Sequence, residues 1–474
     1  IAGARALVEK SLLRYDLTTG HEPRFVMLES IREYARARLN ALGLADEVAH
    51  WHARYFEQLS QTAAHELADA QHDLWLQRCE LELNNFRAAL QWCRQQAPAI
   101  GLQLAANLCD FWYLRGLLTE GRAWLDDLLA RGAECPDNRR VTALTASALL
   151  AVHQGDLSHA TQTASEALRL SRASGDGNGI ARALHGLGNV ALYQSHYAQA
   201  EAFYAEALPW YLEHGPRAHA AQVMNNLGLV AKDQGDFTRA IRYFEDSLAL
   251  RRDIGHQHGI AQSLLNLANA AYWQGNFDRT LELAGQALDL SRHTGYALNV
   301  GYALEALGMA WLKQGQLDRA GDALRESAAH FAKLGDKKGS ALVLIGLGTL
   351  ARVQAQWVEA AQLHRESLKL CVQIGEKRRL AFCLEGLALV ACSQARFRRT
   401  VTLLAAAHIL RAAAGAPLPA IEQVEIDRAL TEARAALNES AFDAAWAAGK
   451  TMSVDEVVDL ALGNEPLAAD SPAA

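Results

Sequence analysis

The chain has 474 residues, 50% of them hydrophobic and 21% charged, which is the composition of a folded protein with several cores or one long array. Its formal net charge of −7 argues against a broad nucleic-acid-binding surface, which needs a basic stripe. Seven cysteines form no CxxC pair, and no apolar run of about 18 residues could span a bilayer. We therefore expect reduced, mostly buried thiols in a cytoplasmic protein with no membrane partner.

Residues 1–43 predict the end of a small α/β unit. We expect a helix, two short strands joined by turn residues 18–23, and a second helix, over residues 4–11, 12–15, 24–27 and 29–42. Ile31, Tyr34, Ala35 and Leu39 would share one face of the second helix. This order is the outline of the last part of a winged-helix domain, so we predict a winged-helix remnant. Because the chain begins at Ile1 without an initiator Met, we expect it to be part of a longer protein.

Residues 44–97 predict a helical connector made of two long helices. Their apolar stripes are Tyr55, Phe56, Leu59 and Ala63 in the first, and Leu76, Cys79, Leu83, Phe86, Leu90 and Cys93 in the second, flanked by Trp75 and Trp92. The helical spacing indicates core positions rather than a cofactor site.

A pattern with a step of 40 residues organises residues 98–415. A large apolar residue, a glutamine three positions before it and a closing glycine recur in phase. They are Leu157, Tyr197, Phe237, Phe277, Leu317, Trp357 and Phe397; Gln154, Gln194, Gln234, Gln274, Gln314, Gln354 and Gln394; and Gly175, Gly215, Gly255, Gly295, Gly335, Gly375 and Gly415. Self-similarity at this period predicts about eight stacked helical hairpins, of which the first, over residues 98–133, is degenerate.

One unit shows how a hairpin is specified. We expect helix A over residues 216–234 and helix B over residues 237–254, with Gly235 taking a positive φ in the turn and Asp236 capping helix B. One position of helix A is always small: Gly188, Gly228, Ala268, Gly308, Gly348 and Ala388. A large side chain there would overpack the crossing of the two helices.

The periodicity stops at Pro417 and Pro419. Helices are expected over residues 421–437 and 441–448, and a capping box at Ser453 and Glu456 opens a last one ending at Leu462. We predict a C-terminal helical cap over residues 416–462 that covers the open end of the array, and a disordered tail over residues 463–474.

The segment NNLGLVAKDQGDFTRAIRYFEDSLAL at residues 225–250 resembles a tetratricopeptide repeat. Its matching markers are Leu227, Gly228, Gly235, Phe237, Ala240, Phe244 and Ser247. The units are about six residues longer than the usual 34, as in the long-helix variety of bacterial regulators. The resemblance implies an all-α fold, a right-handed tetratricopeptide-repeat superhelix of 40-residue hairpins.

The segments LVEKSLLRYD and RFVMLESIREYARARL resemble the winged helix that follows the nucleotide-binding domain in STAND-type signalling ATPases, which include the LuxR-type maltose-regulon activator. The connector and the post-repeat helices are similar to the same regulators. In that family a Met-His-Asp motif contacts bound ADP, and Met27-Leu28-Glu29 falls on it here. Leu28 cannot hydrogen-bond a phosphate, and its alternative role is in the winged-helix core. The ATPase domain would lie upstream, so we expect no nucleotide or other cofactor in this fragment.

No motif predicts an active site or a metal site, and we do not expect an enzyme. Gly449-Lys450-Thr451 imitates the end of a phosphate-binding loop, but Ala444 stands where its first glycine must be. His256 and His258 lie in a loop between repeats and are interpreted as solvated.

The candidate ligand-binding surface is the inner face of the A helices. Its residues are Arg182, His185, Asn189, Gln222, Asn225, Asn226, Lys232, Asn266, Asn269, Tyr272 and Trp273, followed by Tyr302, Glu305 and Arg352. Asparagine can both donate to and accept from a peptide backbone, although these asparagines could instead bond neighbouring helices. The carboxylate-binding variety of these repeats has lysine at the phase of His185, Asn225 and Leu265, so we do not expect recognition of a free peptide C-terminus.

The sequence therefore predicts the ligand-sensing and interaction module of an ATP-dependent transcriptional regulator. Its partner would be a peptide, a protein or a small-molecule inducer in the concave groove, with no direct contact to nucleic acid. The resemblance also implies self-association of the parent protein. The alternative is a passive protein-interaction scaffold with no switching role.

Overall fold

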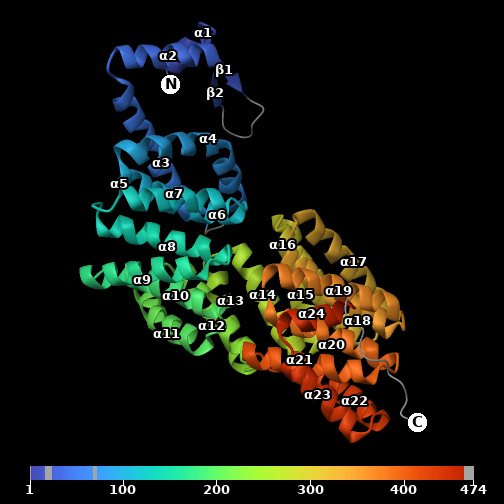
Figure 1. Cartoon of the computed structure of the whole chain (residues 1–474). Helices are drawn as coiled ribbons and strands as arrows, with labels where there is room; N and C mark the ends of the chain where they lie inside the picture. The colour runs from blue at the N-terminus through green and yellow to red at the C-terminus, as the bar shows by residue number, and fades with distance from the viewer. Residues whose placement is uncertain (1, 17–23, 68–71, 464–474) are drawn as a thin grey trace. The chain divides into compact units, whose positions relative to one another are not determined.

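The computed structural model describes residues 2–16, 24–67 and 72–463, which form two compact units, residues 1–190 and 191–474. Twenty-four helices and one two-stranded sheet make up the described residues. Figure 1 shows the helices of each unit following one another in chain order. Residues 464–474 of the predicted tail and the predicted turn at residues 18–23 lie outside the described residues.

The first unit opens with the predicted helix, hairpin and helix. These are α1 (Ala2–Glu9), β1 (Leu13–Asp16), β2 (Arg24–Met27) and α2 (Glu29–Ala41), and the antiparallel strands pair Leu13 with Met27. None of the described residues of α2 is buried, and Tyr34 on its predicted apolar face is 73% exposed. Leu28, interpreted as a core residue of the winged helix, has a side chain that is 45% exposed among the described residues, and its role in the core stays a prediction.

The connector and the degenerate repeat share one core in the first unit. Their helices are α3 (Ala45–Glu66), α4 (His72–Gln96), α5 (Pro98–Asn107), α6 (Cys109–Leu114) and α7 (Leu118–Arg131). Phe56 of α3 meets Phe86 of α4 edge to face, with ring centroids 5.3 Å apart. Tyr55 was predicted in the same stripe but is exposed, because it lies beside Phe56 on the helix and only one of the two can face the core.

Seven helical hairpins follow with the predicted period. In the first unit they begin with α8 (Asp137–His153), α9 (Leu157–Ser174) and α10 (Gly177–Tyr193). In the second unit they continue with α11 (Tyr197–Glu213), α12 (Arg217–Asp233), α13 (Phe237–Asp253), α14 (Gln257–Trp273), α15 (Phe277–Thr294), α16 (Ala297–Lys313), α17 (Leu317–Leu334), α18 (Lys337–Val353), α19 (Trp357–Ile374), α20 (Lys377–Ser393) and α21 (Phe397–Ala414).

Glycine in the A helices makes room for one large side chain of the B helix. A Cβ at Gly228 would lie 2.4 Å from the ring of Phe244, and a Cβ at Gly308 would lie 2.7 Å from Cγ of Leu324. Real side chains do not approach that closely, so each glycine is required by its partner. The A helix and its B helix therefore pack as the recurring small position predicts.

The turns within the hairpins use a left-handed residue. Glycine supplies it after α12 and α14, but Ser195, Ala355 and Ala395 take the same conformation with φ near 60°. That conformation costs a residue with a side chain about 1–2 kcal/mol. Of the seven closing glycines only Gly215 has no positive φ, and it is followed by Pro216.

Three helices end the described chain: α22 (Ala420–Ala436), α23 (Glu439–Thr451) and α24 (Val454–Leu462). The predicted capping box at Ser453 and Glu456 is present. Gly449 belongs to α23, where a Cβ would lie 2.2 Å from the carbonyl oxygen of Thr402 in α21. The Gly-Lys-Thr sequence is thus a helix end packed against α21, and its glycine serves that close approach.

Candidate functional site

The predicted binding residues of the first unit lie on α10. His185 is buried, whereas Arg182 and Asn189 are half-buried. His185 and Asn189 both take part in interactions within the protein. The other candidates belong to the second unit, and a role in binding for the α10 residues stays a prediction.

The asparagines of α12 and α14 contact one another. Asn266 donates a hydrogen bond of 2.8 Å to Oδ1 of Asn225, whose side chain is only 2% exposed. Asn269 accepts a hydrogen bond of 3.1 Å from the indole of Trp273, and Asn226 bonds the hydroxyl of Tyr204. Among these candidates Gln222 is the exposed one. The alternative role, bonding between neighbouring helices, therefore describes what Asn225 and Asn266 do in this structure.

Aromatic candidates lie at the C-terminal end of α14. Tyr272 is buried, and burial raises the pKa of its hydroxyl well above its usual range. Trp273 stacks on Phe382 of α20 with ring centroids 5.7 Å apart. Helix α20 lies three repeats further along the chain, so the array curves enough to bring these rings together.

An ion pair, which we call the clasp, joins two helices across the same curve. Arg378, at the start of α20, pairs with Asp233, at the end of α12, across 145 residues of sequence. Lys232 lies 3.3 Å from the same carboxylate, and burial lowers the pKa of its ammonium group. Burial alone would raise the pKa of Asp233, but the two cations lower it overall. Lys232 is thus engaged by protein charges.

Polar candidates of the later repeats are also enclosed. The hydroxyl of Tyr302 donates to Asp336 at 3.3 Å. Burial raises the pKa of Glu305 to about 7, although the positive charge of Arg379 opposes the shift. Burial therefore favours the protonated form of Glu305.

We call residues 416–425 the tail segment, which is distinct from the predicted tail at residues 463–474. It runs along the C-terminal ends of α12, α14, α16 and α18, and we call these helix ends the inner wall. Pro417 lies at the turn after α12, and Ile421 lies at the turn after α14. Glu422 pairs with Lys313 at the end of α16 at 3.0 Å, and Glu425 pairs with Arg352 at the end of α18. Beyond the tail segment α22 continues to α20, where the thiol of Cys392 faces the carbonyl of Ala429 at 4.0 Å. The tail segment therefore follows the inner wall instead of only covering its open end.

Arg411 fixes the bend between α21 and the tail segment. Its guanidinium donates two hydrogen bonds, of 2.5 and 2.7 Å, to the buried carboxylate of Glu385. It also lies 4.3 Å above the ring of Phe382 and donates to the carbonyl of Ala416 at 3.5 Å. A planar cation can make all three contacts at once. The start of the tail segment is thus tied to the stack formed by Phe382 and Trp273.

A cavity of about 670 Å³ remains between the inner wall and the tail segment. It is lined by charged, aromatic and apolar groups, among them Lys232, Asp233, Trp273, Arg378, Leu418 and Ile421. Two cations face one carboxylate there, so the lining carries a net positive charge. The cavity can accept an apolar group next to an anionic one.

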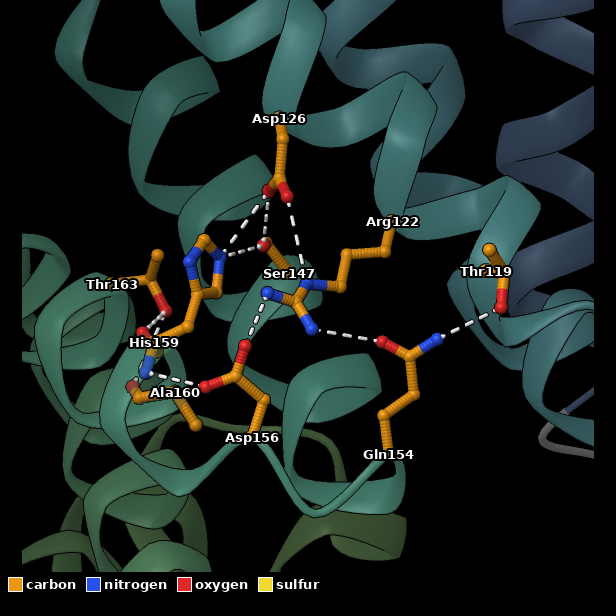
Figure 2. A network of polar contacts seen from close by, with 9 residues as sticks. All are labelled: Thr119, Arg122, Asp126, Ser147, Gln154, Asp156, His159, Ala160 and Thr163. Carbon is orange, nitrogen blue, oxygen red and sulfur yellow. Dashed lines mark hydrogen bonds and ion pairs between the residues drawn. The ribbon is translucent and has the colours of Figure 1, made fainter.

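A polar network in the first unit contains serine, histidine and aspartate (Figure 2). Nε2 of His159 lies 3.1 Å from Oγ of Ser147 and 3.3 Å from the carboxylate of Asp126, to which Ser147 also donates at 2.8 Å. A catalytic triad needs the carboxylate on the opposite ring nitrogen and an accessible hydroxyl, whereas Ser147 is fully buried. The geometry fits a structural network and offers no nucleophile.

The contacts of Gln154 in this network show what the repeated glutamine can do. Gln154 accepts a hydrogen bond from Arg122 and donates one to Thr119, both on α7 (Figure 2). Gln314 likewise donates to Asp278 of the preceding B helix at 2.8 Å. In these two repeats the glutamine joins its hairpin turn to the preceding repeat, a role that its spacing alone did not reveal.

The described residues hold no group of three potential metal ligands, and His258 instead packs its ring against Tyr296 with centroids 4.5 Å apart. None of the helices in the described ranges is long and apolar enough to cross a bilayer. Six of the seven free cysteines are buried.

Residues 135–327 match the family described as the MalT-like TPR region. The matched stretch runs from just before α8 into α17. A Mycobacterium tuberculosis H37Rv protein named as an HTH-type transcriptional regulator is 32% identical over 206 residues, and so is its counterpart in Mycobacterium bovis. Each match takes in 40% of this chain and 22% of the relative, so the chain spans about a fifth of the curated relatives it matches.

Solved structures share the fold at low sequence identity. A STAND protein with a tetratricopeptide repeat sensor from Pyrococcus horikoshii is 15% identical with a TM-score of 0.50, over 78% of this chain and 58% of that one. The apo quorum sensor NprR of Bacillus thuringiensis is 14% identical with the same TM-score, over 72% of this chain and 99% of that one. The predicted all-α tetratricopeptide fold is confirmed, and so is the predicted resemblance to maltose-regulon-activator-like regulators, whereas the winged-helix remnant stays a prediction.

Proposed function

We propose that this chain is the sensor and interaction part of a STAND-type, ATP-dependent transcriptional regulator, and that its inner wall binds a peptide or protein segment. The MalT-like match and the mycobacterial relatives named as transcriptional regulators support the regulatory half of the proposal. A bound segment would shift the parent between resting and active states only if it binds the two states with different affinity.

The observation that carries the binding half is the inner wall itself. It accommodates ten residues of chain by ionic and apolar contacts and leaves a cavity of about 670 Å³ beside them. An amphipathic segment laid in a groove is a common mode of peptide recognition, and the wall offers its polar and apolar partners at regular spacing.

The cavity allows a test that leaves the packing contacts intact. A displayed library of random peptides would be selected on the purified chain, and the enriched peptides measured by fluorescence anisotropy. Gln274→Trp places an indole in the cavity from an exposed turn position, and we expect it to weaken binding by at least about tenfold. Gln354→Trp is the matched control, because it occupies the same exposed position two repeats later and does not line the cavity.

Equal binding to both variants and to the unchanged chain would overturn the proposed site, and so would failure to enrich any peptide. The regulatory half has its own test in the gene. A phosphate-binding strand, loop and helix of the GxxxxGK[ST] type is expected upstream of Ile1, and its absence would reject the STAND assignment.

A further inference from the structure

We propose that the tail segment is a resident competitor: it occupies the inner wall in place of an external acidic, amphipathic segment, which must displace it to bind. This inference rests on the proposed function of the inner wall. It adds the chemical class of the ligand and a regulatory contact within the chain.

The ionic contacts define the charge of the ligand. Lys313 and Arg352 are only 17% and 16% exposed while they pair with Glu422 and Glu425. Removing the tail segment would leave both cations on the wall without these carboxylates. The two carboxylates lie three residues apart at the start of α22, on one face of the helix. A segment that replaces them needs two acidic groups with the same spacing.

The apolar contacts define what precedes the acidic pair. A Cβ at Gly235 would lie 3.2 Å from Cγ of Pro417, and a Cβ at Gly275 would lie 3.6 Å from Cγ2 of Ile421. The two glycine turns thus form shallow seats for apolar side chains of the tail segment. The ligand is therefore an acidic helix start that follows a short apolar stretch.

The acidic part of the tail segment has an exposed outer side. Val424 lies between the two paired glutamates and is 72% exposed, and Glu425 itself is 40% exposed. An ion pair that reaches solvent contributes little to stability. These two ion pairs can be exchanged for those of a competing segment, although its attachment gives the tail segment an effective concentration on the order of millimolar.

The cavity supplies the site of first contact for the competing segment. It is bounded by the wall residues Trp273 and Arg378 on one side and by Leu418 on the other. An apolar side chain next to a carboxylate can enter there before the ion pairs at Glu422 and Glu425 break. Displacement then proceeds from the end of α12 towards the end of α18.

The probe for the test is a fluorescent peptide of residues 416–436, APLPAIEQVEIDRALTEARAA. It is titrated against the full chain and against Glu422→Lys/Glu425→Lys, whose tail segment is repelled by Lys313 and Arg352. We expect the variant to bind the probe at least about tenfold more tightly than the unchanged chain, because its wall is no longer occupied. A probe with the same two glutamates changed to lysine should bind neither protein.

The matched control is Asp427→Lys/Glu439→Lys, which changes the net charge equally at exposed positions away from the wall. It should bind the probe as weakly as the unchanged chain. Equal binding of the probe to all three proteins would overturn the proposal, and so would absent binding to the charge-reversed tail with its helical circular dichroism retained.

A second variant keeps the proposal testable if the first variant does not fold. Lys313→Glu/Arg352→Glu should reject the acidic probe and bind the lysine-bearing probe, and the opposite preference would overturn the proposal.

The two proposals can fail separately. If Gln274→Trp blocks library peptides but the charge-reversed tail gains no affinity for the probe, the competitor fails and the site stands. If the charge-reversed tail binds the probe but no library peptide depends on the cavity, the proposed function fails.

Discussion

His364 should make the second unit sensitive to mild acid. It is 1% exposed, and the structure gives neither of its buried ring nitrogens a hydrogen-bond partner among the described residues. Burial lowers its pKa from 6.5 to about 4, and the positive charge of Arg352 acts in the same direction. The unfolded chain therefore takes up a proton before the folded one does. The shift corresponds to about 3 kcal/mol of stability, fully present above pH 6.5 and lost as the pH falls towards about 4.

The neighbouring repeat shows which side chain would remove this dependence. His364 lies between Gly348 and Gly386, where added Cβ atoms would approach its ring to 2.9 and 2.4 Å. Forty residues earlier Leu324 lies between Gly308 and Gly346 in the same way. Leucine thus fits this setting, and His364→Leu should raise the free energy of unfolding by about 1–3 kcal/mol at pH 7.5, because two unpaired polar atoms are removed.

At pH 5 the increase in the free energy of unfolding caused by His364→Leu should be about 2 kcal/mol larger than at pH 7.5. The assay is urea unfolding at both pH values, read locally by hydrogen exchange of peptides from α19, because a repeat array of this size need not unfold in one step. His293→Leu is the control, since it makes the same substitution at an exposed position. Parallel loss of stability in the unchanged chain and in His364→Leu between pH 7.5 and 5 would refute the reasoning.

Three further predictions concern the turns, the helix crossings and a buried acid. Ala395→Gly should raise the free energy of unfolding by about 0.5–1 kcal/mol in urea, because φ is 58° there; a loss of stability would contradict it. Gly228→Ala should lower it by about 1–3 kcal/mol through collision with Phe244, whereas Gly285→Ala, with open space around it, should not. Glu305→Gln should raise the melting temperature more at pH 8 than at pH 5. The pKa of Glu305 is raised in the folded protein, so the unchanged chain loses stability as the pH rises through about 7. An equal change at both pH values would disprove this.

The repeated part of the fold could be predicted because each hairpin carries its own signals. The helix predicted over residues 216–234 is α12 (Arg217–Asp233), and the next is α13 (Phe237–Asp253) in place of residues 237–254. Gly235 and Asp236 mark the turn by local chemistry that needs no knowledge of distant contacts. Local rules were therefore sufficient for the bounds of the helices.

The inner wall could be predicted only in part, because its contacts join residues far apart in the chain. The 40-residue phase selected Arg352 and Trp273, but not their partners Glu425 and Phe382, which lie 73 and 109 residues away. A sequence period describes how neighbouring repeats pack. It does not predict which distant repeats are brought together by the curvature of the array. One signal was available: two acidic residues follow the proline-rich stretch, while Lys232 and Arg352 share one phase at the ends of A helices.

The clasp between Arg378 and Asp233 has a consequence for how this protein can evolve. In an open array a repeat can be gained or lost with little effect on the others, because each one touches only its neighbours. Here deletion of any single hairpin from α13 to α19 would carry the two clasp residues out of register and break their ion pair. The number of repeats in the second unit is therefore held constant by its own closure, and lineages that keep the clasp should keep the count.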